Sequence, residues 1–338
     1  MHKVQLVELR VPFVTLLKIA FAVLLAFIVI KLWPVILMMI LAVVIAVLLD
    51  PIVVWLEKHR VRKGIGTLAL AFVLFGFLAA FLFVLLPAIA REIAQVSHQV
   101  EPLLKKYGLA MPQIQSPRDL ILRGLVAGKF AIEGITAIFF VLVVALYLLI
   151  EGRRAFSWLI TFAPRQYRAR IDETAREMSG VVLAYMRGNV ITSCICAAYV
   201  AAVLFALKIP LALLLIVIAF IFDFVPVIGT IVMTVPAALL ALTVSTSRAL
   251  IIIALYLLYH LIENYLIAPY VYGNQMRIST LIVIVAIVVG GTLQGVIGAV
   301  LALPFAAAYP IVERIWLRDR LPSDTVARHE ELEEGAGR

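Results

Sequence analysis

The stretch FDFVPVIGTIVMTVP, residues 222–236, interrupts one of the most apolar parts of the chain. It contains an acid, Asp223, the prolines Pro226 and Pro236, and Gly229 beside Thr230. Proline removes a backbone donor and breaks a helix, and broken backbone at membrane depth survives only inside protein or beside water. The stretch therefore predicts a helix end, a turn and a helix start inside a membrane protein. The alternative is a surface loop with Asp223 in water.

The composition supports a membrane protein. Hydrophobic residues make up 64% of the 338 residues, charged residues 14%, and the mean hydropathy is +1.12. Soluble domains carry about 25% charged residues. The long apolar runs favour an all-α polytopic bundle over a barrel, whose strands would alternate apolar and polar. The net charge of +9 indicates Lys and Arg in cytoplasmic loops, and we expect no nucleic acid as a partner.

The two cysteines, Cys194 and Cys196, are two positions apart in an apolar segment. Residues at i and i+2 do not face each other on a helix, so we expect neither a disulfide nor a metal site. Both are expected to be plain buried residues. The first apolar run continues past residue 30 without a cleavage site, so it predicts a transmembrane helix and no cleavable signal peptide.

A membrane span needs about 20 mostly apolar residues. The first five spans are predicted at residues 12–31, 33–56, 66–90, 130–150 and 190–207. Residues 91–129 are predicted to form an extracytoplasmic excursion. Residues 151–188 are predicted to form a basic amphipathic segment in the cytoplasm, on the membrane surface or packed under the bundle.

The last third has weaker breaks. Its apolar segments are residues 211–222, 226–244, 249–268, 278–293 and 296–316. Lys and Arg in residues 57–63 and 151–188 place both stretches, and both chain termini, in the cytoplasm. Ten crossings result, or eight if one adjacent pair is a re-entrant hairpin; we predict about eight, with broken or re-entrant segments in this third. Residues 1–317 are then a single transmembrane domain, and 318–338 a mobile cytoplasmic tail.

A second polar group lies in YHLIENYLIAPY, residues 259–270. His260, Glu263 and Asn264 have the spacing of one helix face, and Pro269 follows. One interpretation is an ionisable site that faces a pathway, with Glu263 as a proton or cation ligand. The other is an interfacial belt with a snorkelling glutamate.

A third motif is GGTLQGVIGAVLALP, residues 290–304. Its glycines form a stripe at helical spacing that would let helices approach closely, and Gln294 needs a polar partner there. PVIGTIVMTVPAA, residues 226–238, echoes GVIGAVLALPFAA, residues 295–307, as in repeat-based transporters. The transport-path candidates are Asp223, Pro226, Gly229, Thr230, Glu263, Asn264, Pro269 and Gln294. The helix-packing and hinge candidates are Pro236, Gly290, Gly291, Gly295, Gly298 and Pro304.

These motifs occur in a definite order: EGR after the fourth span, YMRGN, DFVPVIGT, EN followed by AP, and GVIGAVLALP. In this order they resemble the autoinducer-2 exporter family, or PerM-like permeases, over about residues 10–315. The resemblance implies an inner-membrane transporter with about eight spans. The resemblance places the family's signatures on three groups of residues: Pro226, Ile228, Gly229 and Thr230; Glu263, Asn264 and Pro269; and Gly290, Gly291, Gly295, Gly298 and Pro304. One departure is Asn189, where many members carry glutamine.

The resemblance implies two kinds of transport. Some family members are assigned export of autoinducer-2, a small hydroxyl-rich molecule that Thr230, Asn264, Gln294 and tyrosines could bind. Others are assigned sodium(lithium)/proton antiport, for which Asp223 and Glu263 are the candidate carboxylates. A third hypothesis is a membrane scaffold that acts through residues 91–129 and 151–188 and moves no substrate.

Enzyme activity is not expected from the motifs. The chain shows no nucleophile–base–acid set, no phosphate loop and no HExxH pair. We therefore expect no catalytic residues, cofactor or metal, and a transport process that is passive or coupled to an ion. The expected partners are the lipid bilayer, a small polar solute and H⁺ or Na⁺, and the glycine stripe leaves a homo-oligomer open.

Overall fold

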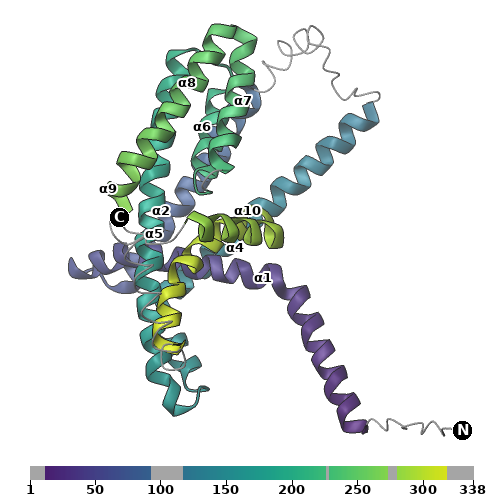
Figure 1. Cartoon of the computed structure of the whole chain (residues 1–338), viewed down its shortest axis with the longest axis vertical. Coiled ribbons are helices and arrows are strands. Elements are labelled where there is room, and N and C mark those ends of the chain that lie inside the picture. The colour runs from purple at the N-terminus through teal and green to yellow at the C-terminus, as the bar shows by residue number, and fades with distance from the viewer. Residues whose placement is uncertain (1–11, 93–116, 226–227, 273–279, 318–338) are drawn as a thin grey trace, which may run out of the picture.

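The computed structural model describes residues 12–92, 117–225, 228–272 and 280–317 (Figure 1). Throughout these residues the secondary structure is helical, without strands. Six helical stretches are long and apolar enough to cross a membrane, and three shorter apolar helices lie in the last third. The prediction of an all-α polytopic membrane protein is therefore confirmed, while the exact number of crossings stays a prediction.

The first helix, α1 (Phe13–Lys58), covers both of the first two predicted spans. The predicted break near residue 32 is wrong, and the helix also continues through Asp50 and Pro51. Proline kinks a helix without having to end it when strongly helical segments flank it on both sides. Pro34 and Pro51 both lie inside α1, and Figure 1 shows that the helix bends and that its N-terminal half extends away from the others.

The next helices are α2 (Lys63–Ala80), the π-helical segment η1 (Phe81–Leu85), α4 (Pro117–Ile160) and α5 (Arg165–Ala206). Residues 151–188 do not form a separate surface helix. Their first part ends α4 and their last part begins α5, because the helical pattern of each span simply continues beyond its apolar stretch. Most of the predicted excursion, residues 93–116, lies outside the described residues.

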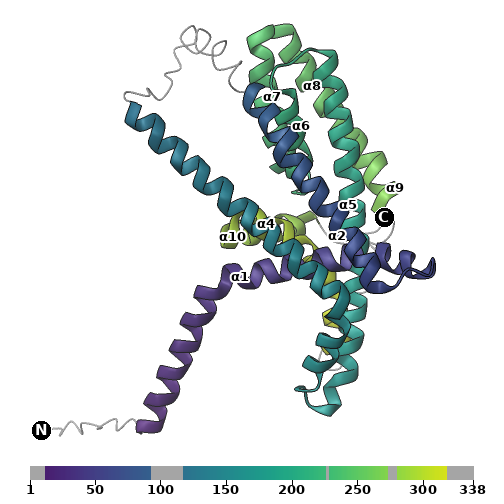
Figure 2. The same cartoon turned by 180° about the vertical axis from the view of Figure 1, so that it is seen from behind.

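Three helices then gather beside one end of α5, as Figures 1 and 2 both show. They are α6 (Ala212–Phe222), α7 (Ile228–Val244) and α8 (Thr246–Ile262), and α8 continues into the π-helical η2 (Glu263–Ile267) and α9 (Ala268–Tyr272). A core of buried residues joins these helices, including Cys196 of α5, Met233 of α7 and Tyr256 of α8. This packing brings the motifs at 222–236 and 259–270 into one bundle.

The last helix, α10 (Thr280–Val312), is broken in the middle. Gln294 (φ −151°, ψ 31°) and Gly295 (φ 58°, ψ −140°) leave helical geometry, and the positive φ suits glycine. Gly290 and Gly298 pack backbone to backbone, since a Cβ on either would collide with the carbonyl oxygen of the other. The predicted stripe of glycines along one helix is therefore wrong. The glycines lie on both arms of α10, which folds back on itself as a helical hairpin.

The turn between α6 and α7 has a similar contact. A Cβ on Gly229 would collide with the carbonyl oxygen of Phe222, the last residue of α6. Gly229 and Gly298 hold the same position in the two V-I-G motifs, so the echo in sequence extends to a shared close contact. The two hairpins also meet, because Val225 belongs to one buried cluster with Ile287 and Leu301 of α10.

The C-terminal end of the described chain is fastened to α5. The π-helical η4 (Glu313–Leu317) follows α10, and its Arg314 forms an ion pair with Glu177. Trp316 Nε1 donates a hydrogen bond to Thr174 Oγ1 at 2.9 Å, and its ring lies 5.9 Å from that of Tyr167. We call these contacts the C-terminal clasp.

Candidate functional site

Asp223 caps the C-terminus of α6, at the start of the turn that leads to α7. Ser193 of α5 donates a hydrogen bond from Oγ to Asp223 Oδ2 at 2.7 Å, and the serine is completely buried. The acid is partly buried and paired with another helix, which favours the interior turn over the surface-loop interpretation. A partner on another helix offsets part of the cost of placing a carboxylate among apolar helices.

His260 of α8 joins the other two predicted polar residues. Its Nδ1 lies 3.3 Å from Thr230 Oγ1 of α7 and 3.2 Å from Glu263 Oε2 at the start of η2. The side chains of His260 and Glu263 are 13% and 15% exposed. The contact thus connects α7, α8 and η2, and π-helical segments of this kind occur frequently at functional sites.

The contact between His260 and Glu263 suits a hydrogen bond. A neutral imidazole carries hydrogen on one of its ring nitrogens, so Nδ1 can donate to the Glu263 carboxylate at 3.2 Å. Asp223 lies within electrostatic range of both groups. We call Ser193, Asp223, Thr230, His260 and Glu263 the polar cluster; it can hold a proton, and its carboxylates can attract a cation.

Aromatic residues of α8 and α5 surround the polar cluster. Tyr256 and Tyr259 are buried, and the ring of Tyr259 stacks on Tyr199 of α5 at 4.7 Å. Among the described residues, Tyr256 Oη, Tyr259 Oη and His260 Nε2 have no hydrogen-bond partner. These groups give the site further capacity to bind a polar molecule.

The other predicted path residues lie apart from this cluster or beyond description. Pro226 is outside the described residues, and Gly229 is buried against Phe222 at the turn. Asn264 and Pro269 are exposed. Asn264 does not share the buried face of His260 and Glu263, although it is only four positions from His260.

The remaining candidates lie at helix breaks and contacts. Gln294 is half-buried at the break in α10, and Pro304 is buried within the second half of that helix. Pro236 is half-buried inside α7, which continues through it. Gly291 makes only ordinary contact with Ala299.

Sequence reasoning missed Ser193 and was wrong about one cysteine. The signal for Ser193 was a run of small polar residues in an apolar span, since Asn189 and Thr192 of α5 are also buried. Cys196 is buried, with Sγ 3.8 Å from Met233 Sδ, whereas Cys194 is exposed because it points away from the α5–α7 contact. Both cysteines are free, as predicted.

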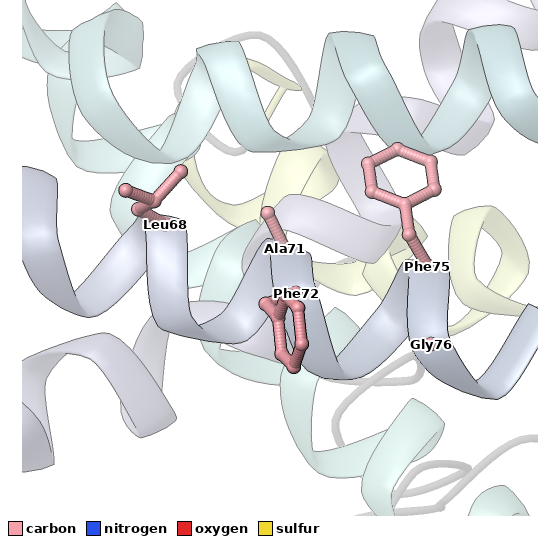
Figure 3. Close-up of a pocket in the computed structure, with 5 residues that line it drawn as sticks. All are labelled: Leu68, Ala71, Phe72, Phe75 and Gly76. Carbon is pink, nitrogen blue, oxygen red and sulfur yellow. The ribbon is translucent and has the colours of Figure 1, made fainter.

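Neither a metal site nor the groove on α2 competes with the polar cluster. Within the described ranges, no group of three or more His, Cys, Asp or Glu could hold a metal ion. A groove of about 540 Å³ lies on α2, lined by Leu68, Ala71, Phe72, Phe75 and Gly76 (Figure 3). Its lining is apolar, so it suits a lipid chain better than a polar solute.

Comparison with known proteins gives a consistent result. A family model described as AI-2E family transporter matches residues 17–317. "Putative transport protein YrrI" of Bacillus subtilis is 22% identical over 83% of this chain and 86% of its own length. "Putative transport protein YhhT" of Escherichia coli is 23% identical over 84% of each chain. "Putative transport protein MT0215" of Mycobacterium tuberculosis is 33% identical over 52% of this chain and 48% of its own.

Proposed function

Since the chain belongs to the AI-2E transporter family, it is a membrane transport protein, and we propose that its transport path passes the polar cluster. One observation carries the proposal. Asp223, His260 and Glu263 are three ionisable groups that lie together among apolar helices. Ionisable side chains at membrane depth are costly and normally mark a substrate or ion pathway.

The proposed solute is a small, polar, mostly uncharged molecule of the autoinducer-2 kind, which the protein exports. Hydroxyl, imidazole and phenol groups surround the site, and such groups suit a solute rich in hydroxyls. Because the sequence has no nucleotide-binding motif, the energy for transport would come from the solute gradient or from a coupled ion.

Cation/proton antiport is a second candidate, favoured by a different observation. Glu263 is a mostly buried carboxylate 3.2 Å from His260 Nδ1, so it is a candidate for exchanging a proton for a cation. Asp223 would add a second negative charge within electrostatic range. Antiport needs these carboxylates, whereas export of an uncharged solute needs them only to orient hydrogen bonds.

We further propose that the protein lies in the bacterial cytoplasmic membrane with its C-terminus in the cytoplasm. The basic residues of 57–63 and 151–188 support this orientation. The prediction of a cytoplasmic N-terminus rests on two crossings before residue 57. Both of these predicted crossings lie in one bent helix, α1, so the side on which the N-terminus lies depends on whether α1 crosses once or twice.

The test uses purified protein in liposomes that contain a pH-sensitive dye. A sodium or lithium gradient is imposed first, and efflux of labelled autoinducer-2 is measured next. The variants are Asp223→Asn and Glu263→Gln, and the control is Glu151→Gln, which removes an exposed carboxylate of α4 instead.

The outcomes separate the two candidates. A cation-driven proton flux that Glu263→Gln abolishes and Glu151→Gln leaves intact would establish antiport. Efflux of autoinducer-2 without a cation-driven flux, weakened by Glu263→Gln, would establish export. If folded protein moves a solute equally well with and without Asp223 and Glu263, the path does not pass the polar cluster.

A further inference from the structure

The turn between α4 and α5 exposes apolar side chains at one end of the molecule. We call residues 153–168 the α4–α5 tip. Trp158, Leu159 and Phe162 are 61%, 58% and 72% exposed. The rings of Trp158 and Phe162 meet edge to face at 4.8 Å, so they form one apolar surface.

The tip holds these side chains in a defined arrangement. Arg168 reaches back from α5 and donates hydrogen bonds to the carbonyl oxygens of Ala163 at 2.9 Å and Thr161 at 2.6 Å. Thr161 Oγ1 donates in turn to the carbonyl oxygen of Trp158 at 2.6 Å. The bonds of Arg168 satisfy carbonyls of the turn that follows α4. The apolar exposure is thus a feature of an ordered turn.

Exposed arginines accompany the apolar surface. Arg153 and Arg154 precede Trp158 on α4, and Arg165 begins α5. Arg154 and Trp158 are four positions apart, so they share a helix face. Glu151, also exposed, is the nearest acid on α4, and the tip remains positively charged. Arginine binds phosphate oxygens through paired N–H groups, so this charge suits a phosphate-bearing surface.

The position of the tip indicates which surface this is. The helical stretch of α4 that could cross a membrane, Ile132–Ile160, ends within the tip, and its apolar run ends at Ile150, just before the tip. Figures 1 and 2 place the tip at the same end of the molecule as the beginning of α1, where Phe13 and Leu17 are exposed. Exposed apolar helices of this kind face lipid. The tip therefore lies where hydrocarbon gives way to headgroups.

We propose that the α4–α5 tip binds anionic phospholipid headgroups at the membrane surface. Trp158, Leu159 and Phe162 enter the boundary between headgroups and acyl chains, where aromatic rings are enriched. Arg153, Arg154 and Arg165 contact the phosphates. Each basic residue near an anionic surface strengthens attraction to it by about fivefold. This binding surface is separate from the polar cluster and does not depend on the transported solute.

The test measures tryptophan fluorescence of the full chain in lipid nanodiscs. The acyl chains of either phosphatidylglycerol or phosphatidylcholine carry bromine, which quenches nearby tryptophan. Subtracting the signal of Trp158→Phe isolates Trp158, and Trp55→Phe isolates the matched control, an exposed tryptophan on α1. Both substitutions affect exposed side chains and preserve an aromatic ring.

The expected result is stronger quenching of Trp158 by brominated phosphatidylglycerol than by brominated phosphatidylcholine. Glutamine at residues 153, 154 and 165 should remove most of this preference, because each arginine contributes about a fivefold attraction to the anionic surface. Equal quenching by both lipids would overturn headgroup recognition. Absence of Trp158 quenching, with Trp55 still quenched, would show that protein covers the tip. Residues 330–338, which include an acidic segment, would then be deleted. If quenching of Trp158 appears, that segment covers the tip. If it does not appear, a second copy of the chain covers the tip.

Discussion

Replacing Gly298 with alanine tests whether α10 is folded into a close hairpin. The added Cβ would collide with the carbonyl oxygen of Gly290, which belongs to the backbone and cannot rotate away. Gly291→Ala is the matched control. It makes the same chemical change in the same helix, but its Cβ would meet only Ala299 Cβ, at 4.0 Å.

The structure gives the expected difference between the two variants. Alanine within a helix stabilises by roughly 0.5–1 kcal/mol relative to glycine, and this gain applies to both positions. Overpacking against fixed neighbours costs about 1–3 kcal/mol, and this cost applies to Gly298 alone. The gain cancels in the comparison. The free energy of unfolding of Gly298→Ala should therefore lie about 1–3 kcal/mol below that of Gly291→Ala.

The assay is reversible unfolding in mixed micelles, titrated with sodium dodecyl sulfate and followed by circular dichroism. Both variants are measured beside the unchanged chain. Gly291→Ala should equal or exceed the unchanged chain in stability. Equal free energies for the two variants would refute the backbone contact between Gly290 and Gly298, and α10 would then be a single straight helix at this point.

Two further predictions concern α5. A lipophilic maleimide should label Cys194, which is exposed, and should leave the buried Cys196 unlabelled until the protein unfolds. Mass spectrometry of the labelled peptides measures this. Labelling of Cys196 in the folded protein would contradict the α5–α7 packing. In the C-terminal clasp, Trp316→Phe should lower the free energy of unfolding by about 1 kcal/mol, because it removes the hydrogen bond to Thr174. Arg314→Gln should lower it by less than about 1 kcal/mol, because the ion pair with Glu177 is largely exposed. A larger loss for Arg314→Gln than for Trp316→Phe in the same titration would be inconsistent with this structure.

The helices of this protein are largely predictable from apolar run length, but their ends are not. The predicted spans are helical where the structure describes them, because about 20 apolar residues can only satisfy their backbone internally in lipid, but the first two spans share α1 and the last two share α10. Whether a proline ends or bends a helix depends on what packs on each side. The same residue type therefore lies inside α1 at Pro34 and immediately before α5 at Pro164.

The candidate site was predictable in part. Asp223, Thr230 and Glu263 stood out because polar residues are rare in such apolar surroundings. In the structure His260 contacts Thr230 and Glu263, and Asp223 lies within electrostatic range of His260 and Glu263. The partner of Asp223 could not be read in the same way, because Ser193 lies 30 positions away on a different helix. Local spacing also misled for Asn264, since spacing does not tell how much of a helix face the neighbouring helices cover.

The length of α5 has a practical consequence. Thr174 of the C-terminal clasp and Ser193 of the polar cluster lie on this one helix, about 28 Å apart at 1.5 Å per residue. The helix is continuous between these two residues and contains no proline, so one backbone ladder joins the C-terminal clasp to the partner of Asp223. A spin label or fluorophore near Thr174 would therefore report whether this end of α5 moves when Asp223 is changed, with no probe placed at the polar cluster itself.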